Sequence, residues 1–323
     1  MVSPVLKEIQ GVEILSLQDN YIDVLTMDAG EVVKRPMLVR PEAEKEVTLT
    51  KSPKAEHGFS SFITVTGEAG PKNMLFDFGC SDDGAAFNAD LLGIDLSRVE
   101  ALALSHGHFD HFGGMKELVK RTRRDDLTLV AHPGVFRRDR FMALPGGVKL
   151  KFPLFSREDV KAAGADIAES KEPRSLLDGT CLFLGEIPRE TEFEKGMTNA
   201  YYLEKGKEVF DPLADDTSLV FHVKGKGLVI LSGCAHSGII NTVKHACRVT
   251  GVDRVYAVMG GFHLTGPTFE HQIKPTIKAL LEINPEYVVP AHCTGRNATL
   301  AIERAMPGKF LLNMSCTSML FKA

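Results

Sequence analysis

The stretch Ala101-Leu-Ala-Leu-Ser-His-Gly-His-Phe-Asp-His111 does most to decide the fold class of this chain of 323 residues. Its apolar start predicts a buried strand, and three imidazoles and a carboxylate follow at once. Neutral imidazole is the commonest protein ligand for zinc, and carboxylates complete such sites. A polar loop that carries histidines by chance is the alternative, but the density of donors favours a metal site. The spacing suits two adjacent ions as well as one.

The composition is that of a soluble globular protein, with 44% hydrophobic and 25% charged residues and a net charge of −4. This slight acidity argues against non-specific binding to nucleic acid or to anionic membranes. The longest apolar run, around residues 227–235, is too short to cross a bilayer, and no secretory signal is visible. Six scattered cysteines indicate reduced thiols. We therefore expect a cytoplasmic protein, with an oligomeric state that the sequence leaves open.

Apolar runs predict two groups of strands, each with helical patterns after its strands. Two such halves predict an α/β domain of two sheets packed face to face with helices outside, and the whole chain is expected to form this single domain. Residues 137–178 have little periodicity and predict an insertion or lid, and residues 30–57 are similarly irregular. Pro275 predicts that its helix begins late or kinks. The strands are expected at 12–17, 62–66, 74–78, 101–104, 127–131, 181–184, 219–223, 228–231, 255–259, 287–289 and 310–314, and the helices at 83–92, 114–124, 239–250, 268–283 and 298–305.

Four later strand ends carry further potential metal ligands: His132, the pair Cys234 and His236, His263, and His292. One histidine after a strand is more often a hydrogen-bonded surface residue than a ligand. Several of them, together with the first motif, favour convergence on one metal site at a common rim. Among them we favour His236 and His292 as ligands.

The pattern His106-x-His108-x-Asp110-His111 after a strand, with later strand-end histidines, resembles the metallo-β-lactamase superfamily. The resemblance covers nearly the whole chain. It implies a four-layer αββα sandwich of two mixed sheets, with one or two metal ions at the rim between the sheets. By this resemblance His106 and His108 hold the first metal, and Asp110 and His111 hold the second. His292 matches the last histidine ligand of the family, on the second metal.

One strand end departs from the family pattern. Most members have Gly-Asp there, which supplies a bridging carboxylate, whereas this chain has Gly233-Cys-Ala-His236. Either the Cys234 thiolate or the His236 imidazole takes that position, and we favour His236. A histidine of the third family motif is also missing, and His132 is the obvious candidate for it.

A narrower resemblance rests on residues 55–60, 185–189, 233–238, 260–264 and 290–295. These segments are similar to a subgroup that includes dihydropterin-methyl ribofuranosylaminobenzene-phosphate synthases of methanopterin biosynthesis. The resemblance implies transfer of a pterin-methyl group with release of pyrophosphate.

Several residues are candidates for binding an anionic substrate. Ser237 and Gly238 open the helix expected at 239–250, where free N–H groups and the helix dipole favour a phosphate. Arg189 could add a guanidinium, whereas Arg137 and Arg138 are better explained as a solvated basic face.

Other polar residues could act around the same site. Asp77 could accept the free N–H of a ligating histidine, or it could be a turn aspartate that bonds its own backbone. His263 could touch substrate from the rim, and Glu56 and His57 could line the pocket. Plain solvated loops explain these last three equally well.

The leading hypothesis is a metal-dependent enzyme acting on a small anionic, phosphorylated substrate. It would work by metal-activated hydrolysis, with Asp110 holding the attacking water, or by pterin-methyl transfer. Imidazole donors favour one or two ions of zinc, with manganese or iron as alternatives, whereas the resembling subgroup is associated with magnesium. Two other hypotheses are a catalytically silent metal-binding or sensor protein and a nuclease of the superfamily. The acidic charge disfavours the nuclease.

Overall fold

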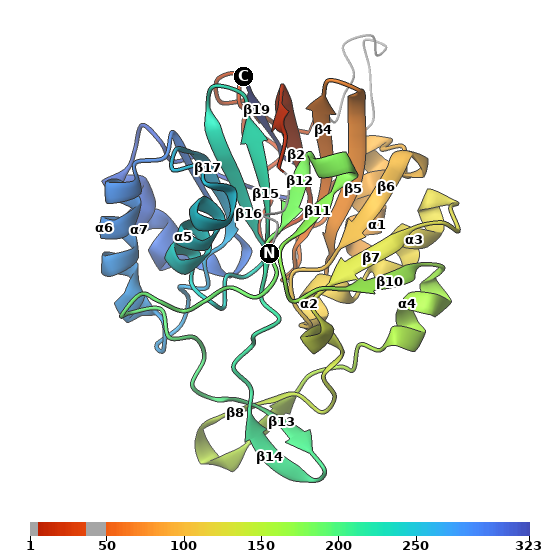
Figure 1. The fold of residues 1–323 in the computed structure, drawn as a ribbon, viewed down its shortest axis with the longest axis vertical. Helices are drawn as coiled ribbons and strands as arrows, with labels where there is room; N and C mark the ends of the chain where they lie inside the picture. The colour runs from red at the N-terminus through yellow and green to blue at the C-terminus, as the bar shows by residue number, and fades with distance from the viewer. Residues whose placement is uncertain (1–5, 37–49) are drawn as a thin grey trace.

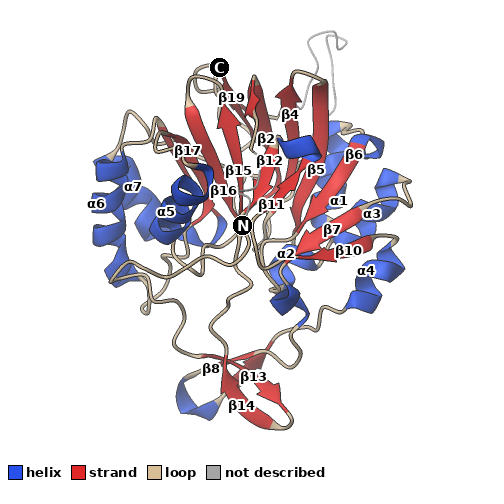
Figure 2. Cartoon of the chain, viewed as in Figure 1, coloured by secondary structure: helices blue, strands red, loops and turns tan. Residues whose placement is uncertain are grey.

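The computed structural model describes residues 6–36 and 50–323. Two β-sheets pack face to face in the middle of the molecule, and helices cover the outer face of each (Figure 1). Figure 2 shows the same layers by secondary structure, with the longer helices on the outside of the two sheets. The predicted α/β class and four-layer αββα sandwich are confirmed.

The first sheet has eight strands. They are β2 (Gly11–Gln18), β3 (Val33–Lys34), β4 (Ser60–Gly67), β5 (Gly70–Phe78), β6 (Val99–Ala103), β7 (Thr128–Ala131), β10 (Asp166–Glu169) and β19 (Ser318–Lys322). Their spatial order is β10-β7-β6-β5-β4-β2-β19-β3. Strands β5, β6, β7 and β10 run parallel to one another, and β2, β4 and β5 form an antiparallel meander. The outer face carries α1 (Gly84–Leu92), α3 (Met115–Thr122) and α4 (Arg157–Ala163).

The second sheet has seven strands. They are β1 (Glu8–Ile9), β11 (Arg174–Leu176), β12 (Cys181–Phe183), β15 (Ser218–Val223), β16 (Gly227–Ser232), β17 (Val255–Gly261) and β18 (Tyr287–Ala291). The order is β11-β12-β15-β16-β17-β18, with β1 paired to β15. Its outer face carries α5 (Ile239–Thr250), α6 (Ile273–Ile283) and α7 (Arg296–Ala305).

Alternating side chains of the strands fill the layers on both sides of each sheet. In β5, Phe76 packs between the two sheets, whereas its neighbour Leu75 packs under the helices of the first sheet. In β17, Met259 likewise packs between the two sheets, whereas its neighbour Val258 packs under the helices of the second sheet. This period of two is what strands buried on both faces require.

Shorter elements connect these layers. A one-turn helix, α2 (Phe109–Phe112), follows β6. The 3-10 turns are η1 (Leu96–Arg98), η2 (Pro133–Phe136), η3 (Pro145–Gly147), η4 (Leu177–Gly179), η5 (Glu270–Gln272) and η6 (His292–Thr294). Within the described residues, no helix is long and apolar enough to cross a membrane.

A small separate sheet projects from the end of the sandwich where α2 lies (Figure 1). It consists of β8 (Phe141–Ala143), β9 (Lys149–Lys151), β13 (Ala200–Glu204) and β14 (Lys207–Phe210), in the order β14-β13-β8-β9. The insertion predicted at residues 137–178 therefore has different bounds. Its first part forms β8 and β9, but α4, β10 and β11 belong to the sandwich, and the rest of the small sheet comes from residues 200–210. Strand β10 lies at an edge and buries little, so it has only a weak apolar pattern.

The last strand also differs from its prediction. Residues 310–314 make a single bridge, between Phe310 and Val288, and the strand is β19 instead. In β19, Met319 and Phe321 pack between the sheets, and this alternation is the pattern of a strand with one buried face. Helix α6 begins at Ile273 with Pro275 in its first turn, as predicted. Of the irregular segment 30–57, residues 37–49 lie outside the described residues.

Candidate metal centre

The candidate ligands meet where strand ends of the two sheets come together. His106 follows β6 of the first sheet, while His236 follows β16 and His292 follows β18 of the second. Strands β16, β17 and β18 are parallel, so their carboxyl ends lie at the same edge. The fold thus brings together donors that are up to 186 positions apart in the sequence.

Three imidazoles form the first cluster. The Nε2 atom of His106 lies 3.0 Å from Nδ1 of His108 and 3.2 Å from Nε2 of His236. Nitrogens bound to one tetrahedral zinc ion at the usual bond length lie about 3.3 Å from one another. Burial lowers the pKa of His108 to about 4 and lowers the pKa values of His106 and His236 well below their usual range. All three side chains are therefore neutral at pH 7, as metal ligation requires.

Asp110, His111 and His292 form the second cluster. Oδ2 of Asp110 lies 3.3 Å from Nε2 of His292 and 3.8 Å from Nε2 of His111. Within the described chain, Nε2 of His292 makes no hydrogen bond although it is buried. A buried polar atom without a partner needs an explanation, and a metal ion in this cluster would provide one.

Cys234 lies between the two clusters. Its Sγ atom is 3.3 Å from Nε2 of His111, and the donor atoms of His106, His111 and Cys234 all lie within 4.8 Å of one another. The sequence analysis favoured His236 for the bridging position, whereas the structure places Cys234 between the clusters and His236 beside His106 and His108. Ala235, with a φ of 45°, turns the chain between Cys234 and His236.

His132 lies outside both clusters. Its Nδ1 atom accepts a hydrogen bond of 3.0 Å from the backbone N–H of Gly134, at the start of η2. Its Nε2 atom faces Glu186 at 3.5 Å. The third imidazole of the first cluster thus comes from His236, and His132 caps a turn.

Comparisons with known proteins agree with this geometry. Residues 56–142 match the profile of the metallo-beta-lactamase superfamily. The chain is 36% identical over 252 residues to 7,8-dihydropterin-6-methyl-4-(β-D-ribofuranosyl)-aminobenzene-5′-phosphate synthase of Methanocaldococcus jannaschii. The match covers 76% of this chain and 83% of that enzyme. The chain belongs to the metallo-β-lactamase superfamily.

Two further proteins are similar to this member of the superfamily. An uncharacterised protein of M. jannaschii is 30% identical over 251 residues, which cover 76% of this chain and 86% of the relative. The crystal structure of a metal-dependent hydrolase of the β-lactamase superfamily superposes with a TM-score of 0.71 and 23% identity. That superposition covers 97% of this chain and all of the other, so the two proteins share the whole fold.

Asp77 supports the second cluster of this metallo-β-lactamase-fold protein from behind. Its Oδ2 atom lies 2.6 Å from Nδ1 of His111 and accepts a hydrogen bond of 2.7 Å from the Ser105 hydroxyl. Burial alone would lower the pKa of His111, but the charges of Asp77 and Asp110 outweigh it and raise the pKa to about 9, so a metal ion bound at Nε2 would replace a proton there. The structure thus places Asp77 where the sequence suggested, oriented to keep Nε2 of His111 toward the cluster.

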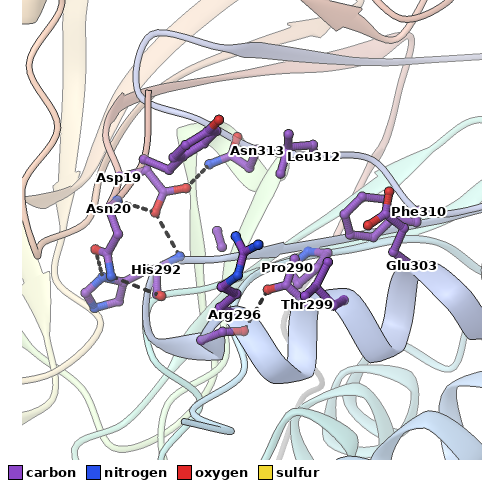
Figure 3. Close-up of a pocket in the computed structure, with 14 residues that line it drawn as sticks. Asp19, Asn20, Pro290, His292, Arg296, Thr299, Glu303, Phe310, Leu312 and Asn313 are labelled. Atoms are coloured by element: carbon purple, nitrogen blue, oxygen red, sulfur yellow. Dashed lines mark hydrogen bonds between the residues drawn. The ribbon is translucent and has the colours of Figure 1, made fainter. Parts of the chain in front are cut away.

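Asp19 and Asn20 support His292 in the same way, and the sequence analysis did not identify them. The backbone N–H of His292 donates to Oδ1 of Asp19 at 2.8 Å, and Nδ1 of His292 lies 2.9 Å from Oδ1 of Asn20. Figure 3 shows these contacts at one wall of a pocket of about 370 Å³, which Arg296 and Phe310 also line. The available signal was an Asp-Asn pair directly after strand β2.

A buried ion-pair network ties the first motif to the small sheet. Oδ2 of Asp215 accepts hydrogen bonds of 2.9 Å from the backbone N–H of Gly107 and from Arg140. Arg140 also donates to Asp211 at 2.8 Å. Arg140 directly precedes β8, so the network holds the base of the small sheet against the His106–His108 turn.

Replacement of Arg140 by alanine should lower the free energy of unfolding by about 3–5 kcal/mol, because Asp215 would stay buried without its cationic partner and Asp211 would keep only Arg137. Urea denaturation would measure this. The exposed pair Lys161–Asp166 provides a matched control, and Lys161→Ala should change stability by less than about 1 kcal/mol. Equal effects of the two variants would contradict a structural role for the network.

The backbone donors of the expected phosphate site at the start of α5 are not free. The backbone N–H of Ser237 donates to Asp216, and that of Gly238 donates to the Ala235 carbonyl, both at 2.8 Å. The N–H groups of the first turn donate to the buried carboxylate of Glu194 at 2.9 Å. These contacts occupy backbone donors that a phosphate would need, whereas the buried Ser237 hydroxyl has no hydrogen-bond partner among the described residues. Phosphate binding at Ser237 and Gly238 stays a prediction.

The structure places the other two candidates for substrate binding, Arg189 and His263, in different surroundings. Arg189 is half-buried, and its Nη2 donates to the main-chain carbonyls of Pro212 and Leu213, whereas its buried Nε has no hydrogen-bond partner among the described residues. His263 does lie at the centre, with its ring centroid 4.2 Å from that of His236. Its left-handed φ of 47° is strained for a residue with a side chain and is typical of functional positions.

The donor set fits divalent metal ions. The two clusters and Cys234 offer five imidazoles, one carboxylate and one thiol, and His57, His263 and Cys293 have donor atoms next to them. The distances from Nε2 of His106 to the ring nitrogens of His108 and His236 are close to those between zinc ligands. Burial would raise the pKa of Asp110, but the charges of His111 and His292 outweigh it and hold the pKa well below its usual range. Asp110 therefore contributes a negative charge at neutral pH.

Proposed function

We propose that this protein is a metal-dependent transferase that acts on small phosphorylated substrates. It would join a dihydropterin-methyl group to a ribofuranosylaminobenzene phosphate and release pyrophosphate. The observation that carries the proposal is the pair of adjacent donor clusters, because two ions side by side can neutralise a diphosphate. The substrate class is taken from the M. jannaschii synthase, which is 36% identical to this chain.

Each cluster has a defined part in this proposal. His106, His108 and His236 would hold the first ion, and Asp110, His111 and His292 the second, with Cys234 between them. The bound ions supply positive charge that neutralises the phosphate oxygens and the leaving diphosphate. Asp77 and Asn20 keep the protons of His111 and His292 on Nδ1, which leaves both Nε2 atoms free for ligation.

A transferase must also keep water from the reacting carbon. Phe152, which follows β9 of the small sheet, packs with its ring centroid 4.8 Å from that of His108. Its ring also stacks on Phe109 of α2 at 6.5 Å. These aromatic contacts support the use of the small sheet as an apolar cover over the first cluster.

Hydrolysis is a second candidate, favoured by one specific observation. Asp110 is ionised, and its buried carboxylate lies 3.5 Å from the exposed His57. In a hydrolase, this carboxylate would orient the attacking water. The presence or absence of the acceptor substrate separates the two reactions.

The test measures pyrophosphate release from a dihydropterin-methyl diphosphate, with and without 4-(β-D-ribofuranosyl)aminobenzene 5′-phosphate. The transferase proposal predicts multiple turnovers and a coupled product only when the acceptor is present. Release at the same rate without the acceptor would identify a hydrolase. Metal binding without turnover in either mixture would contradict both reactions and favour a silent sensor.

Replacement of the metal should show which divalent ion supports activity. Protein stripped with a chelator should regain activity with zinc, and to a lesser extent with manganese or iron, because imidazole and thiolate donors prefer these ions to magnesium. Elemental analysis of the protein purified without added metal, followed by reconstitution, measures this preference. Recovery with magnesium alone would contradict the assignment of Cys234 as a ligand.

A further inference from the structure

His57 is an exposed imidazole over a buried centre. Its Nε2 atom lies 3.5 Å from Oδ2 of Asp110, and its ring centroid lies 4.9 Å from that of His292. The side chain of His57 is 63% exposed, whereas that of Asp110 is 9% exposed. His57 therefore faces both the second cluster and any molecule that approaches it from solvent.

The loop that carries His57 is held in place on both sides. The backbone N–H of Glu56 donates to the Asp19 carbonyl at 3.2 Å, and that of Phe59 donates to the Asp110 carbonyl at 3.1 Å. A side-chain carbon at Gly58 would lie 3.0 Å from the same Asp110 oxygen, so only glycine allows this close approach. These contacts fix His57 relative to α2 and argue against a plain solvated loop.

The side chain of Asn20 determines which nitrogen of His57 carries the proton. Oδ1 of Asn20 accepts from the backbone N–H of Gly58 at 3.3 Å, and Nδ2 donates to the backbone carbonyl of His292 at 3.1 Å. A backbone N–H can only donate and a carbonyl can only accept, so the orientation of the amide is settled.

The two histidines next to Asn20 therefore have opposite tautomers. Nδ1 of His57 lies 3.1 Å from the donor Nδ2 of Asn20 and must accept, so the proton of neutral His57 is on Nε2. Nδ1 of His292 lies 2.9 Å from the acceptor Oδ1 and must donate, so Nε2 of His292 is bare. One amide thus prepares His292 as a metal ligand and His57 as a hydrogen-bond donor.

We propose that His57 binds substrate, and that its Nε2–H donates a hydrogen bond to an anionic phosphate oxygen held at the second cluster. The inference rests on the proposed function, because the anion is the diphosphate of that reaction. His57 lies close enough to Asp110 and His292 to share a metal with them, but a protonated Nε2 has no lone pair to offer, so we assign His57 as a donor and not as a ligand. A fixed donor at this place stabilises negative charge on the leaving diphosphate. Asn20 is the positioning residue.

The first test is NMR of the metal-loaded full-length protein labelled with ¹⁵N-histidine. Long-range ¹H–¹⁵N spectra should show Nε2 of His57 protonated and Nδ1 unprotonated, with the His57→Gln spectrum used for assignment. In Asn20→Asp the donor to Nδ1 is lost, and the His57 proton should move to Nδ1. A proton on Nδ1 of His57 in the unsubstituted protein would overturn the inference.

The second test uses inorganic pyrophosphate as a probe in calorimetry of the metal-loaded protein. His57→Ala should weaken pyrophosphate binding by about tenfold and keep the metal content unchanged. His57→Gln, which retains an N–H donor, should restore part of the affinity. His271→Ala, which removes another exposed histidine, should have no effect. Loss of an ion in His57→Ala, or unchanged pyrophosphate affinity, would refute the donor role.

These measurements are independent of turnover. If pyrophosphate binding follows the predicted order but no transfer is found, the proposed reaction fails and the role of His57 as an anion donor remains. If transfer is found and His57→Ala binds pyrophosphate normally, the reaction stands and the donor role fails.

Discussion

Replacement of Asp110 by alanine should leave the protein folded, remove the ion of the second cluster and reduce turnover by at least about 10³-fold. The Asp110 carboxylate is the negative donor that faces His292 at 3.3 Å and His111 at 3.8 Å. A catalytic metal contributes several kcal/mol of charge stabilisation, and each 1.4 kcal/mol corresponds to a factor of ten in rate. Elemental analysis and pyrophosphate release measure the two effects together.

Asp82→Ala is the matched control, because Asp82 is an exposed aspartate on the loop after β5. It should retain the full metal content and the full rate. An Asp110→Ala protein that keeps both ions and normal turnover would show that this carboxylate has no part in the centre. Circular dichroism of both variants would verify that they remain folded.

His236→Ala and His132→Ala should have opposite consequences. Nε2 of His236 lies 3.2 Å from Nε2 of His106, so its loss should empty the first cluster and reduce turnover by about 10³-fold. His132 accepts a hydrogen bond from Gly134 at the start of η2 and faces Glu186, away from both clusters, so its loss should lower stability by about 1 kcal/mol and leave the metal content intact.

This comparison decides between two assignments of the third imidazole in the first cluster. If His132→Ala lost the first ion and His236→Ala retained it, the donor set described for that cluster would be wrong. Both variants remove an imidazole next to a strand end, so a general effect of histidine loss would appear in both.

The sequence was sufficient where the chemistry is local. The donors from His106 to His111 lie in one run after an apolar strand, so their convergence needed no knowledge of the distant chain. Asp77 was suggested by its place at a strand end, and the structure puts it beside His111. The sandwich followed from the alternation of strand and helix patterns together with the resemblance to the superfamily.

The sequence was insufficient where a backbone turn decides the geometry. Cys234 and His236 are two residues apart, and only the left-handed Ala235 between them lets one enter the space between the clusters and the other complete the first cluster. The Gly-Asp position of related proteins suggested a single ligand there, which made His132 the apparent candidate for the missing imidazole.

Contacts between segments far apart in the chain also could not be predicted from the sequence. Asn20 contacts His292 across 272 positions, and Glu194 fills the start of α5 from a loop 46 positions earlier. Strand β8 of the small sheet pairs with β13, which lies beyond α4 and β10 in the chain. Local patterns say nothing about such pairings, because each depends on which strands become neighbours.

The most direct test of the metal centre is a crystal structure with anomalous diffraction recorded at the absorption edge of the native metal. We predict two ions per chain, one among His106, His108 and His236 and one among Asp110, His111 and His292, with the sulfur of Cys234 between them. A centre that stays empty after soaking with zinc, or an ion bound through His132, would contradict this prediction.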